Sequence, residues 1–541
     1  MRPPYGRSSE HAHSYPWAFL DAFDRYRERV MFLREGRPVL TYGEAYKEVF
    51  RLARALAERG LRRGDGVAVL AADTPGTILA QLAAQLIGCY YVRLNVLEAG
   101  TKHMTDGFAE ADAKALVFDP LSPIPPSADL LERAPLALSL GPSPMGADLL
   151  ETAARQSPAP MPAHGRDDDP GELVFTSGST TGRPKLACYT FERLTALTRY
   201  WEAPTDRADP ELDVFHDSPP CTLLAFPLLT SAPGMGLMPT LLHGGRVVLT
   251  HGFDTGDVLK AIERDRVTVA RMVPTRLYRL LDHPDLATTD LSSLRSLIYF
   301  GAPIAQPRLR EALSRLGPIL AQSYGLNEAR MVSVLHPADH VNGRPEVLRS
   351  AGRPRNGVEV TVRDREGNPV PTGSVGELWV RSPYAMNGYW QQPELTSRTV
   401  TDGWIRTGDL GHVDQEGYLY LVDRLRDMAF VEGTNCYTRE VEDVLSSHPA
   451  VRHVSVVGLP DEETGEALHA AVVGQPGAAV SEEELRALVR AEKSRLHAPR
   501  TIVFLDEIPL TPVGKPDKQA VRQYLAQRLR NAEHGASENM R

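Results

Sequence analysis

Hydrophobic positions along the first part of the chain follow two alternating periods. Residues 51–61 (RLARALAERGL) place apolar side chains at helical spacing, and residues 66–72 (GVAVLAA) form the apolar run of a buried strand. A helix pattern at 77–88 and a strand pattern at 89–95 repeat this succession. Because strands that alternate with helices build parallel sheets, the rhythm predicts an α/β architecture with largely parallel sheets.

The same rhythm returns further along the chain. Residues 256–273 show a helix pattern followed by an apolar strand, and residues 293–303 show a strand pattern followed by a helix pattern at 307–317. In contrast, residues 120–169 are rich in Pro, Ser and Ala and lack a clear period. We therefore expect that segment to be a loose connection within a large N-terminal unit.

The pattern of hydrophobic and turn-forming residues changes near Val358. Short strands separated by turns predict a smaller β-rich subdomain there, and a compact α+β stretch follows Arg424. The patterns in that stretch are a helix at 439–449, strands at 453–460 and 467–474, a helix at 482–496 and a strand at 501–509.

The predicted fold class is α/β, with a large N-terminal domain of layered α/β subdomains that ends in a small β-rich subdomain. A small, mobile α+β C-terminal domain follows. We expect these domains at residues 15–423 and 424–530, and we expect residues 1–14 and 531–541 to be disordered tails.

Composition narrows the class of protein. A chain of 541 residues is too long for one ordinary core, and its net charge of −9 gives no electrostatic footprint for nucleic acid. The N-terminus lacks the apolar core of a secretion signal, and no apolar stretch reaches membrane-spanning length. The four cysteines, Cys89, Cys188, Cys221 and Cys436, show no spacing suited to a disulfide framework or to zinc. We expect a cytoplasmic protein, monomeric or homodimeric, with no nucleic-acid partner and no membrane span.

The sharpest local signal is the segment TSGSTTGRPK at residues 176–185, which follows the apolar run ELVF. Glycines allow the backbone to approach phosphate oxygens, hydroxyl groups donate to them, and Lys185 offsets their charge. The segment is not a Walker loop, because only three residues separate Gly178 from Gly182. Taken alone, such a turn is more often a plain loop.

Other polar segments follow the loop in a fixed order. They are Tyr324-Gly325-Leu326-Asn327-Glu328, Arg406-Thr407-Gly408-Asp409, Asp423-Arg424 with Arg426-Asp427, and Pro512-Val513-Gly514-Lys515. Together with the loop, this set resembles the AMP-forming superfamily of acyl- and aryl-CoA synthetases, peptide-synthetase adenylation domains and luciferases. The resemblance runs from about Leu40 to Leu525 and implies a stand-alone member.

The resemblance implies roles for individual residues. Tyr324 would pack on adenine, Glu328 would hold Mg²⁺, and Asp409 would accept both ribose hydroxyls, a task that suits the two oxygens of a carboxylate. Arg424 would face the ribose and the phosphates. Lys515 would bridge the acid to the α-phosphate, where a cation stabilises the charge that builds up at phosphorus.

The complete expected site combines catalytic and nucleotide-binding residues. The catalytic residues would be Lys515, Glu328, Lys185 and Asn327, with Glu328 as the metal ligand. The cofactor-binding residues would be Thr176, Ser177, Gly178, Ser179, Thr180, Thr181, Gly182, Gly301, Ala302, Pro303, Tyr324, Gly325, Asp409, Arg424 and Gly433. The implied cofactors are ATP or AMP and Mg²⁺, and coenzyme A is one candidate acceptor.

In such enzymes the small domain rotates after adenylation. Arg426 is similar to the hinge residue, and residues 431–435 would form the acceptor-side loop, with Gly433 beside the pantetheine tunnel. Lys518, by comparison, has the pattern of an exposed lysine in a turn.

A few positions depart from the usual pattern of the superfamily. Asn327 replaces a threonine and can still donate through its amide, Leu186 replaces a glycine, and Thr438 replaces a proline. Thr230 stands where many members place a histidine or an aromatic residue, which favours a polar or small acid.

The predicted reaction joins ATP and a small aryl or acyl carboxylic acid to give acyl-AMP and pyrophosphate. The acyl group then passes to coenzyme A, to a carrier-protein thiol or to an amine. Two alternatives stay open at this stage: a diazotase that adenylates nitrite for reaction with an aromatic amine, and an inactive nucleotide-binding relative. A Walker-type kinase is disfavoured by the spacing of the loop.

Overall fold

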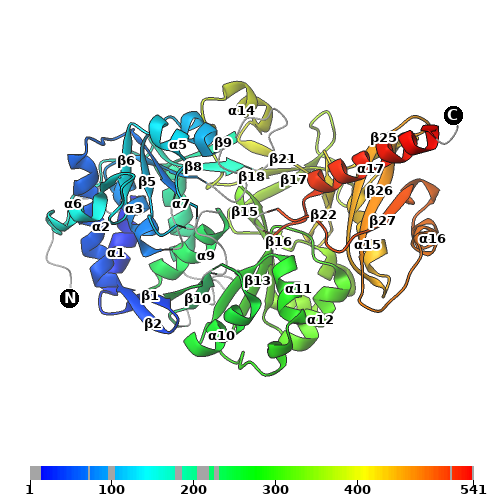
Figure 1. The fold of residues 1–541 in the computed structure, drawn as a ribbon, viewed down its shortest axis with the longest axis horizontal. Coiled ribbons are helices and arrows are strands. Elements are labelled where there is room, and N and C mark those ends of the chain that lie inside the picture. Colours follow the sequence, from blue (N-terminus) through cyan, green and yellow to red (C-terminus); the bar gives the residue numbers. More distant parts are fainter. Residues whose placement is uncertain are drawn as a thin grey trace.

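The computed structural model describes residues 14–70, 74–94, 104–122, 124–176, 185–203, 218–224, 231–250, 252–511 and 514–538. The described strands form two large sheets in the N-terminal domain, a smaller sheet beside them and a further sheet in the C-terminal domain. In Figure 1 the chain passes from the N-terminal domain on the left to the C-terminal domain on the right.

The first large sheet is parallel from β1 to β14 and antiparallel at its two ends. Its strands in spatial order are β16 (Arg353–Pro354), β15 (Arg330–Leu335), β14 (Leu320–Leu326), β13 (Ser296–Phe300), β12 (Val269–Met272), β10 (Cys221–Leu224), β11 (Arg246–Leu249), β1 (Val30–Arg34) and β2 (Arg37–Thr41). Helices α10 (Thr255–Asp265), α11 (Pro274–Asp282) and α12 (Gln306–Leu316) cover one face, where they share a hydrophobic cluster with β10, β12 and β13.

The second large sheet is parallel from β8 to β7, and β9 and β19 extend it in the antiparallel direction. Its strands in spatial order are β19 (Gly388–Tyr389), β9 (Lys185–Thr190), β8 (Pro170–Thr176), β4 (Tyr90–Arg93), β3 (Gly66–Leu70), β5 (Ala113–Phe118), β6 (Leu136–Ser139) and β7 (Ala147–Asp148). The predicted α/β class with largely parallel sheets is therefore confirmed.

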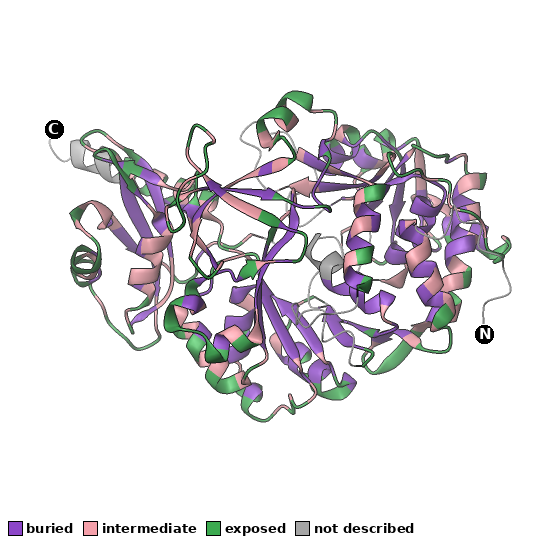
Figure 2. Ribbon diagram, turned by 180° about the vertical axis from the view of Figure 1, so that it is seen from behind, coloured by how far each residue is buried: buried purple, intermediate pink, exposed green. Residues whose placement is uncertain are grey.

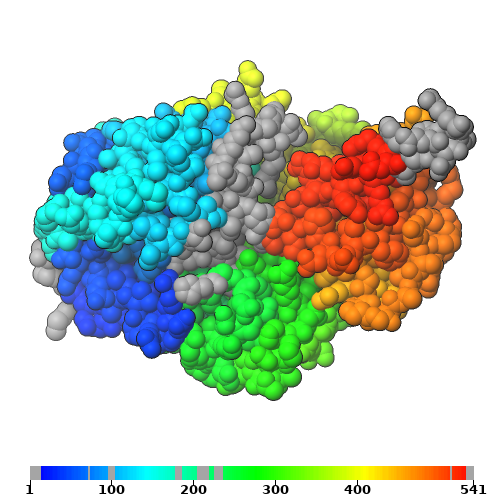
Figure 3. All heavy atoms as spheres, viewed as in Figure 1, coloured from blue at the N-terminus to red at the C-terminus, as the bar shows by residue number. Residues whose placement is uncertain are grey.

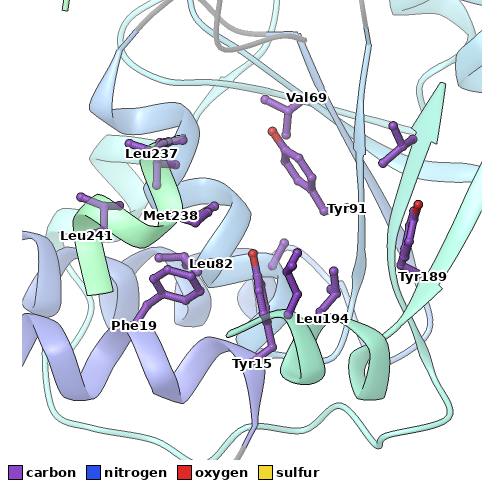
Figure 4. Packing of buried hydrophobic residues seen from close by; sticks show 14 of the residues in the cluster. Tyr15, Phe19, Val69, Leu82, Tyr91, Tyr189, Leu194, Leu237, Met238 and Leu241 are labelled. Atoms are coloured by element: carbon purple, nitrogen blue, oxygen red, sulfur yellow. The ribbon is translucent and has the colours of Figure 1, made fainter. Parts of the chain in front are cut away.

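A layer of helices lies between the two large sheets and contributes most of the core. These helices are α1 (Tyr15–Arg25), α2 (Tyr42–Glu58), α3 (Pro75–Leu86), α7 (Phe191–Glu202) and α9 (Ser231–Leu242). Figure 4 shows Tyr15 and Phe19 of α1, Leu82 of α3, and Leu237, Met238 and Leu241 of α9 meeting near Tyr91 and Val69 of the sheet. Helix α2 begins at a capping box, in which Thr41 and Glu44 satisfy each other's backbone amides. In Figure 2 the strands are mostly buried and the outer helices are exposed on one side, as amphipathic helices require.

The β-rich subdomain that the sequence predicted is present, and its sheet is antiparallel. Its strands are β17 (Glu359–Arg363), β18 (Gly376–Arg381), β21 (Trp404–Val413), β20 (Val400–Thr401) and β22 (Leu419–Arg424). Shorter helical elements at the periphery are α13 (Pro337–Asn342), α14 (Pro393–Thr399), η1 (Pro284–Ala287) and η2 (Pro345–Arg349).

The C-terminal domain is a small α+β unit with its own hydrophobic cores. Its elements are β23 (Ala429–Val431), β24 (Thr434–Cys436), α15 (Thr438–Ser446), β25 (Val451–Asp461), β26 (Gly465–Gly474), α16 (Glu482–Glu492), η3 (Arg495–His497), β27 (Thr501–Phe504) and α17 (Lys518–Glu538). Helix α17 continues beyond the boundary expected at residue 530, so residues 531–538 of the expected disordered tail are helical. The other domain boundaries stay predictions.

The expectation for residues 120–169 is wrong. This segment contains α5 (Ala128–Arg133), β6, β7 and α6 (Leu149–Ala154), and β6 pairs in parallel with β5 at the edge of the second sheet. These elements are only two to six residues long, too short to show a hydrophobic period.

Among the described helices, none is long and apolar enough to cross a membrane.

Candidate active site

A buried carboxylate joins the two motifs predicted to hold the nucleoside. The Tyr324 hydroxyl at the end of β14 donates to Asp409 Oδ2 at 2.6 Å, and Arg424 Nε lies 3.1 Å from Asp409 Oδ1. Asp409 is only 6% exposed. Burial, followed by the charge of Asp409, raises the pKa of Tyr324 well above its ordinary value, so the phenol stays protonated and donates. Each carboxylate oxygen has two lone pairs, so Asp409 can still accept from ribose hydroxyls.

Asp409 is positioned by its backbone and by the neighbouring strand. It pairs with Arg424 in the antiparallel β21–β22 ladder, which places the two charged side chains side by side. Its amide donates to Thr407 Oγ1 at 3.0 Å, and Thr407 in turn donates to the Leu378 carbonyl at 2.7 Å. Glu377 Oε1 accepts from the Gly408 amide at 3.2 Å. The Gly408–Asp409 segment of β21 is thus held by Thr407 and by Glu377 of the neighbouring strand.

Lys515 reaches the N-terminal domain from the C-terminal domain. A Cβ built on Gly301 would lie 2.7 Å from Lys515 Cε and 3.0 Å from Nζ, and the φ of Gly301 is +82°. Only glycine accepts both conditions without strain. Phe300 and Ser323 are paired in the adjacent parallel strands β13 and β14. The residues that follow them, Gly301 and Tyr324, therefore lie side by side at the same edge of the sheet. The structure therefore brings Lys515 to the edge where Tyr324 and Asp409 meet.

The other end of the site holds the residues predicted to meet phosphates. Thr176, the last residue of β8, is paired with Lys185, the first residue of β9. Lys185 Nζ lies 6.0 Å from the centre of the Tyr389 ring, and the Tyr389 hydroxyl donates to Glu328 Oε1 at 2.8 Å. Burial and Glu328 raise the pKa of Tyr389, which keeps this donor protonated.

The turn that carries Asn327 and Glu328 is tied to the second sheet. Asn327 Nδ2 donates to the Phe175 carbonyl at 2.8 Å, and the Tyr189 hydroxyl donates to the Asn327 carbonyl. Behind the turn, Arg330 Nη2 donates to Glu172 Oε2 at 2.5 Å, and both side chains are buried. This ion pair joins β15 to β8, although Arg330 has a left-handed φ of +62° that disfavours a side chain.

The carboxylate of Glu328 suits Mg²⁺, which binds one or two protein carboxylates together with phosphate oxygens and water. Among the described residues, no group of three or more His, Cys, Asp and Glu side chains is placed to hold a metal ion by itself. A magnesium ion would therefore need the phosphates of the nucleotide as well as Glu328.

The remaining predicted residues adjoin this cluster, lie apart from it or fall outside the described part of the chain. Ser177, Gly178, Ser179, Thr180, Thr181, Gly182 and Thr230 lie outside the described residues. Ala302 and Pro303 follow Gly301, and Gly325 is exposed beside Tyr324. Gly433 lies in an exposed turn between β23 and β24, where an added Cβ would meet no atom within 4 Å. Its role beside a pantetheine tunnel stays a prediction.

The expectation for Lys518 is wrong. Its Nζ donates to Thr438 Oγ1 at 2.7 Å and lies 2.9 Å from Glu442 Oε1, and its side chain is 23% exposed. Sequence analysis also missed Tyr389, Glu172, Arg330 and Glu377. The signal for Tyr389 was present as an aromatic residue beside glycine in NGYW, but its partner Glu328 is 61 positions away.

These features define the class of the protein. A layered α/β domain carries a Tyr324–Asp409–Arg424 network, and a small second domain supplies a lysine to it, as in adenylate-forming enzymes. The sequence model for the AMP-binding enzyme matches residues 19–390, and that for the AMP-binding enzyme C-terminal domain matches residues 440–515. The chain belongs to the AMP-binding enzyme family.

Similar proteins agree with this assignment. The medium/long-chain-fatty-acid–CoA ligase FadD8 of Mycobacterium tuberculosis is 37% identical, over 93% of this chain and 88% of the relative. The feruloyl-CoA synthase of an Amycolatopsis species is 36% identical, over 91% and 95%. The structure of the amide bond synthetase McbA from Marinactinospora thermotolerans is 40% identical, with a TM-score of 0.85 over 94% of this chain and 99% of that one. The prediction of an AMP-forming ligase that adenylates an acid is confirmed.

Proposed function

We propose that the acid is a small carboxylic acid with an apolar aryl or acyl body, and that the acceptor is a thiol. The support for the acid class is that relatives over most of the chain act on medium- and long-chain fatty acids, ferulate and indoleacetate. The support for the thiol is that these relatives are coenzyme A ligases or synthases, and a further relative from Streptomyces coeruleorubidus is an acyl-carrier-protein ligase.

The observation that carries the proposal is the position of Lys515 against Gly301, next to the Tyr324–Asp409–Arg424 network. Adenine packs on Tyr324, the ribose hydroxyls donate to Asp409, and the phosphates extend toward Thr176 and Lys185. Glu328 holds Mg²⁺, which neutralises phosphate charge when it is bound. These roles are proposals for the residues that the structure groups.

In the first half-reaction a carboxylate oxygen of the acid attacks the α-phosphorus. The bond from the α-phosphorus to the oxygen that bridges to the β-phosphate breaks, and pyrophosphate leaves. Lys515 stabilises the negative charge that develops between the acid and the α-phosphate, and it orients the two anions that would otherwise repel each other. In the second half-reaction the acceptor attacks the acyl carbon, and AMP leaves.

A second acceptor class has specific support. The amide bond synthetase McbA is 40% identical over almost the whole chain, so an amine is a candidate in place of a thiol. The proposed setting is the cytoplasm, because the four cysteines are free thiols, as is usual in a reducing compartment. A monomer or homodimer remains part of the proposal.

The test is pyrophosphate release with a panel of octanoate, ferulate, indoleacetate and nitrite, each with coenzyme A, with a primary amine or with no acceptor. We expect release with at least one carboxylic acid, AMP as the nucleotide product, and a thioester or an amide according to the acceptor. Release with nitrite alone would favour the diazotase. ADP as the product, or no turnover with any acid, would overturn the proposal.

A further inference from the structure

The two domains meet at a second place, away from Lys515. Asp282, the last residue of α11, receives one guanidinium from each domain: Arg308 Nη2 of α12 lies 2.7 Å from Oδ1, and Arg452 Nη2 of β25 lies 2.8 Å from Oδ2. The three side chains are 32%, 15% and 38% exposed. Figure 3 shows the surface of the N-terminal domain near residue 300, in green, meeting the orange surface of the C-terminal domain.

An aromatic contact accompanies this ion pair. The rings of Tyr278 in α11 and His453 in β25 stack with centroids 5.7 Å apart and planes 18° apart. Arg308 also contacts Tyr278, because its guanidinium lies 5.1 Å from the ring centre and donates to the Tyr278 carbonyl at 2.9 Å. We call Tyr278, Asp282, Arg452 and His453 the α11 latch.

Helix α11 contacts the C-terminal domain at both of its ends. In its first turn, Thr275 Oγ1 donates to the carbonyl of Gly514, the residue before Lys515. At its last residue, Asp282 binds Arg452. Thr275 and Asp282 are seven residues apart in this helix, so the two contacts are about 10 Å apart at 1.5 Å per residue. A single contact would leave a pivot, whereas two contacts on one rigid helix fix an orientation.

We propose that Arg452 is a positioning residue for adenylation, because its ion pair with Asp282 fixes the domain orientation that keeps Lys515 against Gly301. This inference rests on the proposed function of Lys515. Arg452 touches none of the residues grouped in the active site, and it acts through the position of Lys515.

The latch is weak enough for the C-terminal domain to leave the adenylation orientation after the first half-reaction. Partly exposed ion pairs contribute little each, so the latch biases the orientation without locking it. Both groups of the pair lie outside the hydrophobic cores of the two domains. Loss of Arg452 should therefore change the population of the closed orientation more than the stability of either domain.

The central experiment compares the two half-reactions in Arg452→Ala. ATP–pyrophosphate exchange with ferulate or octanoate should fall about threefold to tenfold, the range expected for loss of about one partly exposed ion pair and its packing. Transfer from the chemically made ferulate or octanoate adenylate to the acceptor should stay at the wild-type rate or rise. Arg452→Lys should recover part of the exchange rate, since it keeps the charge.

Three controls separate positioning from general damage. Arg490→Ala removes an exposed arginine of the same domain whose partner Glu483 lies within the same helix, so both half-reactions should stay unchanged. Asp282→Asn should lower exchange like Arg452→Ala, and the double variant should be no worse than Asp282→Asn alone. Amide hydrogen exchange is measured on the wild type and on Arg452→Ala without acid or ATP. The amides of α11 and β25 should exchange faster in the variant than in the wild type.

The outcomes are decisive for the latch and for the function separately. Equal loss in both half-reactions, additive effects in the double variant, or unchanged hydrogen exchange would each overturn the latch. If the wild type shows no exchange with any acid, the proposed function fails, and the hydrogen-exchange comparison still decides whether Arg452 fixes the orientation.

Discussion

Replacing Tyr389 with phenylalanine removes one hydroxyl and tests whether Glu328 holds the metal. The Tyr389 ring is buried, with 8% of its surface exposed, and it lies beneath Lys185 Nζ at 6.0 Å. Phenylalanine keeps the ring and that contact. The variant loses the hydrogen bond from the hydroxyl to Glu328 Oε1, which measures 2.8 Å, and the contact of that hydroxyl with Thr399.

Two opposing effects follow from this loss. A hydrogen bond to a charged group contributes about 1.5–3 kcal/mol, but Glu328 is partly exposed and water can replace part of the bond. Fixing a glutamate side chain costs up to about 2 kcal/mol of rotamer entropy, which binding of the metal must then supply. Loss of the hydroxyl also frees one lone pair of Glu328 for the metal. This gain is small, because a carboxylate already has about four lone pairs. The loss of orientation is the larger effect, and it should weaken Mg²⁺ binding by about 1–1.4 kcal/mol.

We therefore expect Tyr389→Phe to raise the half-saturating Mg²⁺ concentration about fivefold to tenfold. The assay is a Mg²⁺ titration of ATP–pyrophosphate exchange at fixed ATP, with the melting temperature measured in parallel. Tyr418→Phe is the matched control, because that residue is buried and its hydroxyl donates at 2.7 Å to a different carboxylate, Asp339. An unchanged or lower Mg²⁺ requirement in Tyr389→Phe, or the same rise in the control, would refute the assignment of Glu328.

Three further predictions follow from the site and from the buried histidines. Asp409→Ala should raise the KM for ATP about 10- to 150-fold through loss of about 1.5–3 kcal/mol, and a circular-dichroism spectrum of an unfolded protein would instead make Asp409 structural. Lys515→Ala should slow ATP–pyrophosphate exchange about 100- to 1,000-fold and leave transfer from synthetic adenylate near the wild-type rate; equal losses would contradict its proposed role. Burial lowers the pKa of His340 to about 4, so between pH 6.5 and 4 the unfolded chain binds a proton that the folded chain does not. Unfolding in urea should show about 1.6 kcal/mol less stability at pH 5 than at pH 6.5 from this group, and a flat profile that is the same in His340→Gln would exclude it.

The elements with long hydrophobic periods could be predicted from the sequence. The strand expected at 66–72 is β3 (Gly66–Leu70), and the helix expected at 482–496 contains α16 (Glu482–Glu492). The short elements in 120–169 could not be predicted, because β6 is defined by its pairing with β5 and not by a local pattern. A strand of four residues gains its stability from a neighbour that lies distant in the sequence.

The grouping of the site could be predicted in part. Ordered motifs placed Tyr324, Asp409, Arg424 and Lys515 in one site, and the structure groups them, although their roles toward ATP stay predictions. The contacts that position the motifs could not be predicted. The Arg330–Glu172 pair, for example, joins residues 158 positions apart, and nothing near either residue identifies its partner.

One departure from the usual pattern and one wrong expectation have the same physical cause. Asp423 is buried, and it accepts from the amide and the hydroxyl of Thr438 at 2.5 and 3.0 Å. A proline at 438 would have no N–H to donate, so threonine there allows Asp423 to be satisfied twice. Thr438 Oγ1 in turn accepts from Lys518, which therefore becomes part of a buried network with Glu442 and not an exposed lysine in a turn.

This network lies directly beside the nucleotide site. Asp423 precedes Arg424 on β22, the last strand before the C-terminal domain, and Arg424 binds Asp409. Thr438 begins α15 and Lys518 begins α17, so the first residues of both helices are anchored next to Asp423, which precedes Arg424. The rotation predicted about Arg426 would break the bonds between Asp423 and Thr438. Asp423 therefore links α15 of the C-terminal domain to β22, the strand that carries Arg424.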